Sequence, residues 1–294
     1  MIIFQLLANG LITGCGYALV ALGFAFIYGT TRIFHFAHGA VYTLSAYLFY
    51  TFYNLLNWPL SLSIAVSLLL TALCSILIDE VFYTPLVRRG ASLFIQMLTS
   101  IGLYIVMVNL IAMFFQNETR ILSPDAQPTY SIGIVILTRI QVATLASSFG
   151  LFGALVLLLK RTYLGKVIRA MRDDSTLVSA MGMNPQSIRR IVFALGSGLT
   201  GVSAILSGLD VGIDPHIGLA AFLNGAVAVI IGGVGFFEGA AIGGLFLGLL
   251  QNFAIWKIST RWQDSVTYIV LIIFLLFCAE GFMGKKRRTE EVNV

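Results

Sequence analysis

Apolar residues occur along this chain in long runs, separated by short polar stretches. Each run is close to the roughly 20 residues that an α-helix needs to cross the hydrocarbon core of a membrane. Strands of a membrane β-barrel would instead alternate in segments of about ten residues. The pattern predicts an all-α polytopic membrane domain over residues 1–294, with about eight or nine membrane-embedded helices, some broken or re-entrant. The expected spans are 2–28, 36–57, 61–84, 92–115, 141–159, 187–207, 218–234, 239–256 and 264–283.

The composition supports a membrane protein. Hydrophobic residues make up 58% of the chain and charged residues 11%, whereas a soluble domain carries about 25% charged residues. Each of the three cysteines, Cys15, Cys74 and Cys278, stands alone in an apolar run, so neither a metal site nor a disulfide framework is expected. The start of the chain, MIIFQLLANG, has no positively charged leader, so we expect the first span to be retained rather than cleaved.

Lysine and arginine mark the orientation, because they gather on the cytoplasmic side of membrane proteins. They follow the third span at Arg88 and Arg89, fill the segment 160–190, and close the chain at 285–288. This alternation predicts an outside N-terminus and an inside C-terminus. The loop 257–263 holds two basic residues and conflicts with that threading. The net charge of +5 reflects topology, and no nucleic-acid partner is expected.

One internal segment, KRTYLGKVIRAMRDDSTLVSAMGMNPQSIRR at 160–190, is too polar to span a membrane. Asp173, Asp174 or Ser175 can cap the start of a short helix, and Gly182 is placed to end it. The apolar face of this helix has no evident cover in the chain, which predicts a cytoplasmic partner protein. A solvated connecting loop is the alternative.

Three blocks resemble a known family. The stretch GKVIRAMRDDSTLVSAMGMN resembles the cytoplasmic coupling loop of permease subunits from ABC importers for branched-chain amino acids. HFAHG at 35–39 and the glycine-rich block that begins at Asp214 resemble the same family, and the resemblance runs from Asn9 to about Gly281. Urea and short-amide permeases share these blocks, and Ala40 stands where the family pattern has an acidic residue, so the cargo stays open. The resemblance implies that coupling to an ATPase involves Gly165, Arg169, Ala170, Asp173, Asp174, Ala180 and Gly182.

A polar interruption, GTTRIFHFAHG at 29–39, follows the first span. Broken helix at membrane depth is tolerated only inside protein or along a water-filled path. His35 and His38 are three residues apart and would face one way on a helix, while Gly29 and Gly39 permit a bend. A simple inside loop, with Arg32 as a topology signal, explains the charges equally well. The family resemblance favours a gate or path.

A second interruption, GGVGFFEG at 232–239, holds the acidic residue Glu238. Interrupted segments in both halves of a transporter point to its path, although Glu238 could also pair with a basic neighbour. Two histidines without a third ligand do not make a zinc site. The candidates for the translocation path or gate are His35, Phe36, His38, Gly39, Asn9, Asn224 and Glu238.

Other motifs are absent or have an ordinary explanation. No G-x-x-x-x-G-K-[ST] phosphate loop and no plausible nucleophile, base and acid set occur, so the chain is not expected to be an enzyme or to hold a cofactor. GSGLTG at 196–201 lies inside a span and fails the context of a nucleotide fingerprint. Glycines four residues apart, at Gly10/Gly14, Gly239/Gly243 and Gly244/Gly248, fit close helix packing in lipid.

The resemblance implies a transmembrane permease subunit that moves Leu, Ile or Val by alternating access, in a bacterial or archaeal inner membrane. It also implies a second, homologous permease subunit, two ABC ATPase subunits that bind ATP and Mg, and an extracytoplasmic substrate-binding protein. The alternatives are a urea or short-amide permease, an ion-coupled secondary transporter, and a scaffold that transports nothing.

Overall fold

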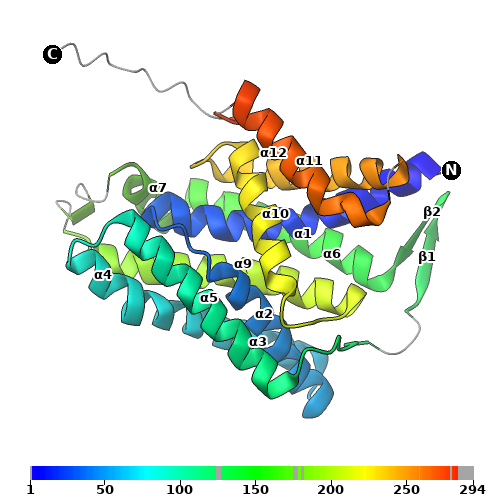
Figure 1. Ribbon diagram of the computed structural model, residues 1–294, viewed down its shortest axis with the longest axis horizontal. Helices are drawn as coiled ribbons and strands as arrows, with labels where there is room; N and C mark the ends of the chain where they lie inside the picture. Colours follow the sequence, from blue (N-terminus) through cyan, green and yellow to red (C-terminus); the bar gives the residue numbers. More distant parts are fainter. Residues whose placement is uncertain are drawn as a thin grey trace.

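The described part of the chain is a bundle of α-helices with one two-stranded hairpin (Figure 1). The computed structural model describes residues 2–123, 127–174, 178–179, 182–257, 259–278 and 280–283. The first half contains α1 (Ile2–Thr31), α2 (His38–Tyr50), the π-helical turn η1 (Thr51–Leu55), α3 (Leu60–Ile78), the π-helical turn η2 (Asp79–Tyr83), α4 (Thr84–Arg88) and α5 (Leu93–Phe115). The second half contains β1 (Thr129–Ile132), β2 (Val135–Thr138), α6 (Arg139–Arg161), α7 (Tyr163–Asp173), α9 (Pro185–Val211), α10 (Ile217–Gly232), α11 (Phe237–Lys257), η3 (Thr260–Trp262) and α12 (Gln263–Phe277).

All of the expected apolar spans are helical, which confirms the all-α membrane domain. Within the described residues, six helical stretches are long and apolar enough to cross a membrane: α1, α3 continued through α4, α5, α6, α9 and α11. The helices α10 and α12 are apolar but shorter, and α2 is continued by η1. The expected number of eight or nine embedded helices is therefore approximate, because some of these segments are too short to span alone.

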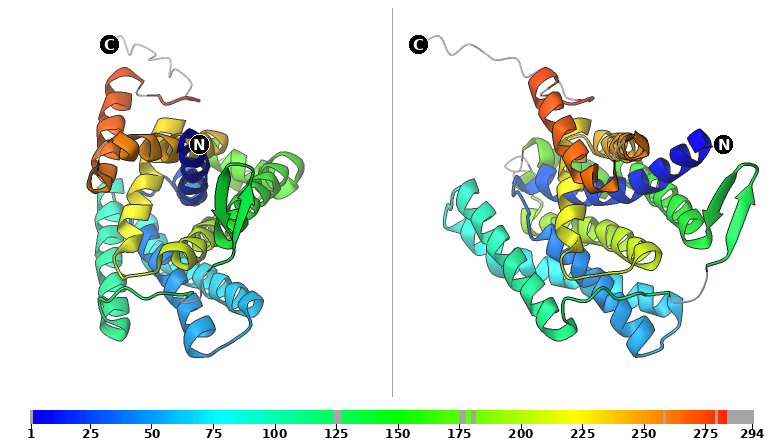
Figure 2. Two further views of the ribbon diagram at one scale, coloured as in Figure 1. Left: turned by 90° about the vertical axis from the view of Figure 1, so that its right-hand side faces the viewer. Right: turned by 45° about the vertical axis from the view of Figure 1, so that its right-hand side comes forward.

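The first helix, α1, is the centre of the bundle. In its most apolar window 72% of the residues are buried, against 17% for α5 and 22% for α6. A helix that is hydrophobic all round belongs in the interior, and α1 contacts α6, α9, α10 and α11. Figure 2 shows α1 nearly end-on, with these helices around it. The segments that lie before and after α1 are thereby held inside the protein.

Small residues let α1 and α11 approach closely. A Cβ atom added to Gly14 would lie 2.8 Å from the Cα of Leu245, and one added to Gly248 would lie 2.2 Å from the backbone nitrogen of Gly14. Lipid supplies no hydrophobic force between helices, so such close van der Waals contact is what holds them together. The expected small-residue contacts are confirmed for Gly10 and Gly14 against Gly244 and Gly248.

The ends of the bundle differ in charge. At one end, which we call the basic end, α1 finishes, α9 begins, and Arg189 of α9 forms a buried ion pair with Asp79. Arg190 pairs with Glu80 beside it. The antiparallel hairpin of β1 and β2 lies at the opposite end, which we call the hairpin end, near the N-terminus of α1 (Figure 1).

We expect Gly248→Leu to prevent α1 and α11 from packing, because the new side chain would overlap the backbone of α1. Overpacking a core costs about 1–3 kcal/mol, and backbone overlap should place this variant at the top of that range or above. Gly150→Leu on α6 is the matched control, since a Cβ there meets nothing within 4 Å. Thermal unfolding in detergent measures both variants; a Gly248→Leu protein as stable as the control would contradict this packing.

Candidate functional site

The chain is irregular between α1 and α2, from Arg32 to Ala37. Arg32 makes the sharp turn, with a φ of 60°. The expectation that glycines make this bend is wrong, because Gly29 and Gly39 both lie in regular helix. Gly39 instead permits close contact: a Cβ there would lie 2.7 Å from the carbonyl oxygen of Gly218 on α10.

The two histidines of HFAHG lie together in the interior. Both are fully buried, and their ring centroids are 5.6 Å apart. His35 Nδ1 lies 2.8 Å from the hydroxyl of Tyr83, and His38 Nε2 lies 2.6 Å from Oγ1 of Thr200. We call His35, His38, Tyr83 and Thr200 the histidine layer. Such burial favours an enclosed segment over a simple solvated loop.

Each of these imidazoles keeps one nitrogen without a hydrogen-bond partner in the described structure, Nε2 in His35 and Nδ1 in His38. Buried polar atoms are nearly always paired, because leaving one unpaired costs about 1–3 kcal/mol. Eight other buried side-chain atoms of the described residues are also unpaired. The two imidazole nitrogens differ from these in lying together, so another conformation or a passing ligand could pair with both.

Aromatic rings close the space around the histidine layer. Phe222 of α10 is central, with its ring centroid 4.8 Å from that of Phe36 and 5.3 Å from that of Phe24. Phe34 packs against Phe24 at 5.2 Å. The sequence-based candidate Phe36 therefore belongs to the wall of this layer.

Two cavities lie on opposite sides of the histidine layer. The hairpin-end cavity holds about 350 Å³ and is lined by α1 over Ile12 to Val20 and by α9 over Ser203 to Val211. The basic-end cavity holds about 430 Å³ and is lined by Thr30 and Thr31 of α1 and by the first turns of α9. Along both helices the layer stands between them: a Cβ on Gly23 would touch Thr200 and His38.

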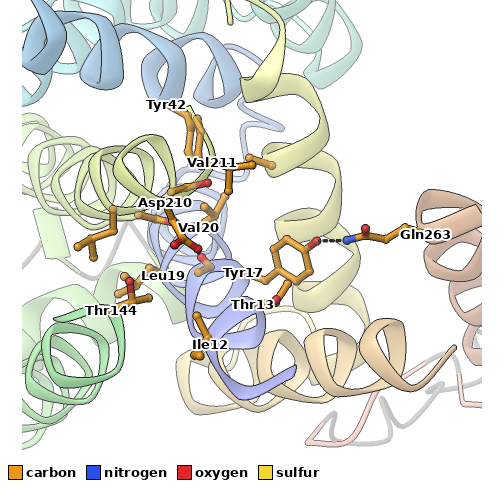
Figure 3. A pocket seen from close by; sticks show the side chains of 15 residues that line it. Ile12, Thr13, Tyr17, Leu19, Val20, Tyr42, Thr144, Asp210, Val211 and Gln263 are labelled. Atoms are coloured by element: carbon orange, nitrogen blue, oxygen red, sulfur yellow. Dashed lines mark hydrogen bonds between the residues drawn. The ribbon is translucent and has the colours of Figure 1, made fainter. Parts of the chain in front are cut away.

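The hairpin-end cavity gathers side chains from several helices. Figure 3 shows side chains of α1, α2, α6 and α9 converging on it, with Gln263 of α12 reaching Tyr17. Among the described residues that line it, Asp210 is the one that carries a charge. This cavity was missed by sequence reasoning, although Asp210 inside an apolar run is a signal that could have pointed to it.

The two candidate asparagines lie in different places. Asn224 belongs to a buried polar network, in which its Oδ1 accepts from Gln251 at 3.2 Å and from Thr267 at 3.0 Å. Tyr17 joins the same network by donating to Gln251 at 2.8 Å. Asn9 lies near the hairpin end and accepts from Gln5 at 3.1 Å. Neither residue lines the histidine layer.

The second interruption is a turn at the basic end of the bundle. Gly233 and Gly235 have φ values of 104° and 96°, and they reverse the chain between α10 and α11. Glu238 lies in the first turn of α11, and its carboxylate lies 3.9 Å from Lys160, with both side chains partly exposed. This geometry fits pairing with a basic neighbour rather than a place in a path.

The expected coupling segment begins with the helix α7. Thr162 caps it by accepting from the backbone of Gly165 at 3.0 Å. A Cβ on Gly165 would lie 2.3 Å from the carbonyl oxygen of Leu158, and Arg169 donates to that of Leu159 at 2.6 Å. Gly165 and Arg169, which precede Ala170 in the same helix, therefore fasten α7 to the end of α6.

One expectation about this segment is wrong. The apolar face has a cover within the chain, since Val178 is buried against Val167 and Met171 of α7. Asp173 ends α7, and Asp174 follows it in extended backbone. Residues 178–179 are helical, but the rest of the helix that these aspartates were expected to cap lies outside the described residues. Gly182 has a φ of 78°, which suits the predicted helix end. Ala180 lies outside the described residues.

Arg172 connects this segment to two others, a role that sequence reasoning missed. Its Nη1 donates to the carbonyl oxygen of Gly235 at 2.9 Å, and its guanidinium lies 5.8 Å from the ring of Phe236 and 5.9 Å from that of Phe237. Arg32 donates to the carbonyl oxygen of Arg172 at 3.2 Å. The segment thus touches both the turn between α10 and α11 and the break after α1.

Known proteins resemble this chain over nearly its whole length. The family model described as "Branched-chain amino acid transport system / permease component" matches residues 6–275. The high-affinity branched-chain amino acid transport system permease protein BraD of Pseudomonas aeruginosa is 31% identical, over 96% of this chain and 95% of its own. The corresponding protein LivH of Escherichia coli K12 is 26% identical over the same shares.

The fold also matches a solved structure. A chain in the structure of PsaBC from Streptococcus pneumoniae in complex with Fab superposes with a TM-score of 0.50 over 92% of this chain and 91% of that one. At 14% identity this match concerns the fold alone. The family match and the relation to BraD identify the chain as a membrane-spanning member of the permease family of branched-chain amino acid transport systems.

Proposed function

We propose that this chain is the membrane permease subunit of an ABC importer that carries leucine, isoleucine or valine. The observation that carries the proposal is the relation to BraD over 96% of the chain, since that relative is named as a branched-chain amino acid permease. Urea and short amides, the alternative cargo, are named in none of the relatives compared. ATP and Mg belong on separate ATPase chains, because this sequence has no phosphate loop.

The proposed partners are a second permease chain, two ATPase subunits and an extracytoplasmic binding protein. Positive charge collects on the cytoplasmic side, so the basic end, with Arg32, Arg88 and Arg190, would face the ATPases. The N-terminus would then lie outside and the C-terminus inside. The coupling segment, α7 with the described residues up to Gly182, stands at this end and would offer the docking surface.

The geometry supports alternating access. With a cavity at each end and a closed histidine layer between them, a solute could enter from one side while the other stays sealed. Docked ATPases would move α7, and Arg172 would pass this motion to the turn between α10 and α11. Because α10 carries Phe222 and α2 carries His38, a shift of α10 would open the layer.

Reconstitution tests the proposed function. The proteoliposomes contain this chain, its partner permease and both ATPases, with the binding protein on the opposite side of the membrane. We expect them to move labelled leucine toward the side of the ATPases when ATP is supplied on that side. Labelled urea is the comparison cargo, and vesicles with this chain alone are the control. Uptake of urea in place of leucine, or concentration of leucine by this chain without ATPase, would contradict the proposal.

Replacing His38 tests whether the histidine layer takes part in transport. We expect His38→Ala to lower leucine uptake by about tenfold or more, because Thr200 loses its partner, and one unsatisfied buried group shifts a conformational balance by about 1–3 kcal/mol. His216→Ala is the control, since that histidine is exposed. The measurement is the initial rate of leucine uptake. If the rate of His38→Ala equals that of His216→Ala, the HFAHG segment has a structural role only.

Replacing Arg172 tests whether this residue passes motion of α7 to the turn between α10 and α11. Arg172→Gln removes the contacts to Gly235 and to the two phenylalanine rings, so we expect ATP hydrolysis to continue while the leucine moved per ATP falls severalfold, by about 1–2 kcal/mol of lost coupling. Lys166→Gln, an exposed change of the same charge on the same helix, should retain wild-type coupling. If both variants move the same amount of leucine per ATP, Arg172 does not couple ATP hydrolysis to transport.

A further inference from the structure

The hairpin-end cavity is shaped for a small solute. Its volume of about 350 Å³ lies within the ~300–1,000 Å³ range of ligand pockets. It follows α1 from Ile12 to Val20, a rise of about 12 Å at 1.5 Å per residue. It ends about one helical turn before Gly23, which touches the histidine layer. A solute held here would wait directly at the barrier.

Asp210 gives this cavity a negative charge. It is the one charged residue among those that line the cavity, near the last turn of α9. In the described structure no lysine, arginine or histidine forms an ion pair with it. Its hydrogen-bond neighbour is Gln141 of α6, an amide that leaves the charge uncompensated. Asp210 is exposed at the end of α9, so its carboxylate can receive a charged group that enters the cavity from the hairpin end.

Two of the hydroxyl groups that line the cavity with Asp210 offer acceptors rather than donors. Thr144 donates its proton to the carbonyl oxygen of Ile140 at 2.9 Å, and Ser203 donates to that of Gly16 at 3.0 Å. With these protons engaged, the oxygen lone pairs remain for the cavity. An acceptor-rich site beside a carboxylate suits a cation with several N–H donors, which describes an ammonium group.

Part of the wall is aliphatic. Ile12, Leu19 and Val20 of α1 line the cavity together with Leu206 and Val211 of α9. Such a surface favours a branched alkyl group, because burying each CH₂ gains about 0.8 kcal/mol. The cavity thus offers a carboxylate for a charged amine and an aliphatic surface for a hydrocarbon chain.

We propose that the hairpin-end cavity is a transient binding site for the substrate within this subunit, in which Asp210 receives the α-ammonium group and the aliphatic wall receives the branched side chain. The site rests on the proposed function and adds the residue that recognises the amino group. It lies one step before the histidine layer, on the side where the binding protein would deliver its cargo.

Direct binding tests the site without relying on transport. The probe is 3-methylbutylamine, which has the branched chain and the ammonium but no carboxylate, and ligand-observed NMR measures its affinity for the purified importer. We expect Asp210→Asn to weaken this binding by about tenfold or more, since a hydrogen bond to a charged group contributes about 1.5–3 kcal/mol. Asp210→Glu should keep most of the affinity. The exposed carboxylate Glu118 provides the control, Glu118→Gln, at the same end of the bundle.

Transport provides the second readout. In the reconstituted importer, Asp210→Asn should lower the leucine moved per ATP, while ATP hydrolysis stimulated by the loaded binding protein shows that the complex is assembled. If Asp210→Asn does not assemble, Gly16→Val replaces it: a Cβ there has its nearest neighbour, Oγ of Ser203, at 3.7 Å, so the new methyl groups would fill the cavity and should block both binding and uptake.

The outcomes separate the two proposals. A wild-type importer that moves no branched-chain amino acid contradicts the proposed function, and the amine binding then still decides the site. Amine binding that is equal in wild type, Asp210→Asn and Glu118→Gln overturns the site, even if leucine transport is normal. Unchanged binding and uptake in Gly16→Val overturns it as well.

Discussion

Close contact between helix backbones is the constraint on which the rest of this structure depends. Lipid gives no hydrophobic force between helices, so α1 is held at the centre by glycines that bring α11 and α9 within van der Waals distance of it. Gly23 of α1 meets Gly196 and Thr200 of α9, and Gly14 meets Leu245 of α11. The enclosed position of α1 then makes its irregular continuation possible, because backbone that leaves regular helix must lie inside protein.

This constraint places the histidine layer in the middle of the subunit, between the hairpin end and the basic end. The break after α1 places His35 and His38 in the interior, where Tyr83 and Thr200 pair with them and phenylalanine rings fill the remaining space. A cavity remains on each side of this layer. At the basic end, Arg172 links the coupling segment to the turn between α10 and α11. Motion at one surface therefore has a continuous chain of contacts toward the barrier.

Sequence patterns predicted the helical spans well, because span length depends on local hydrophobicity alone. They also located HFAHG, since two histidines in an apolar run are costly unless enclosed. They failed where a role depends on partners distant in the chain. The apolar face of the segment 160–190 was expected to lack a cover in the chain, yet Val178 packs against α7, and the stretch 232–239 was expected to line the path, yet Glu238 lies beside Lys160. Arg172 and Asp210 went unnoticed, because their meaning lies in Gly235 and in the cavity wall, which only the fold brings near.

The central claim is that the histidine layer is a barrier that closes and opens with the ATP cycle. Labelling of Thr200→Cys by a membrane-impermeant thiol reagent, in a chain whose Cys15, Cys74 and Cys278 have been replaced, tests it most directly in the reconstituted importer. The buried position of Thr200 predicts no labelling from either side at rest and labelling during ATP turnover. Rapid labelling at rest, or none at any stage of turnover, would contradict the account.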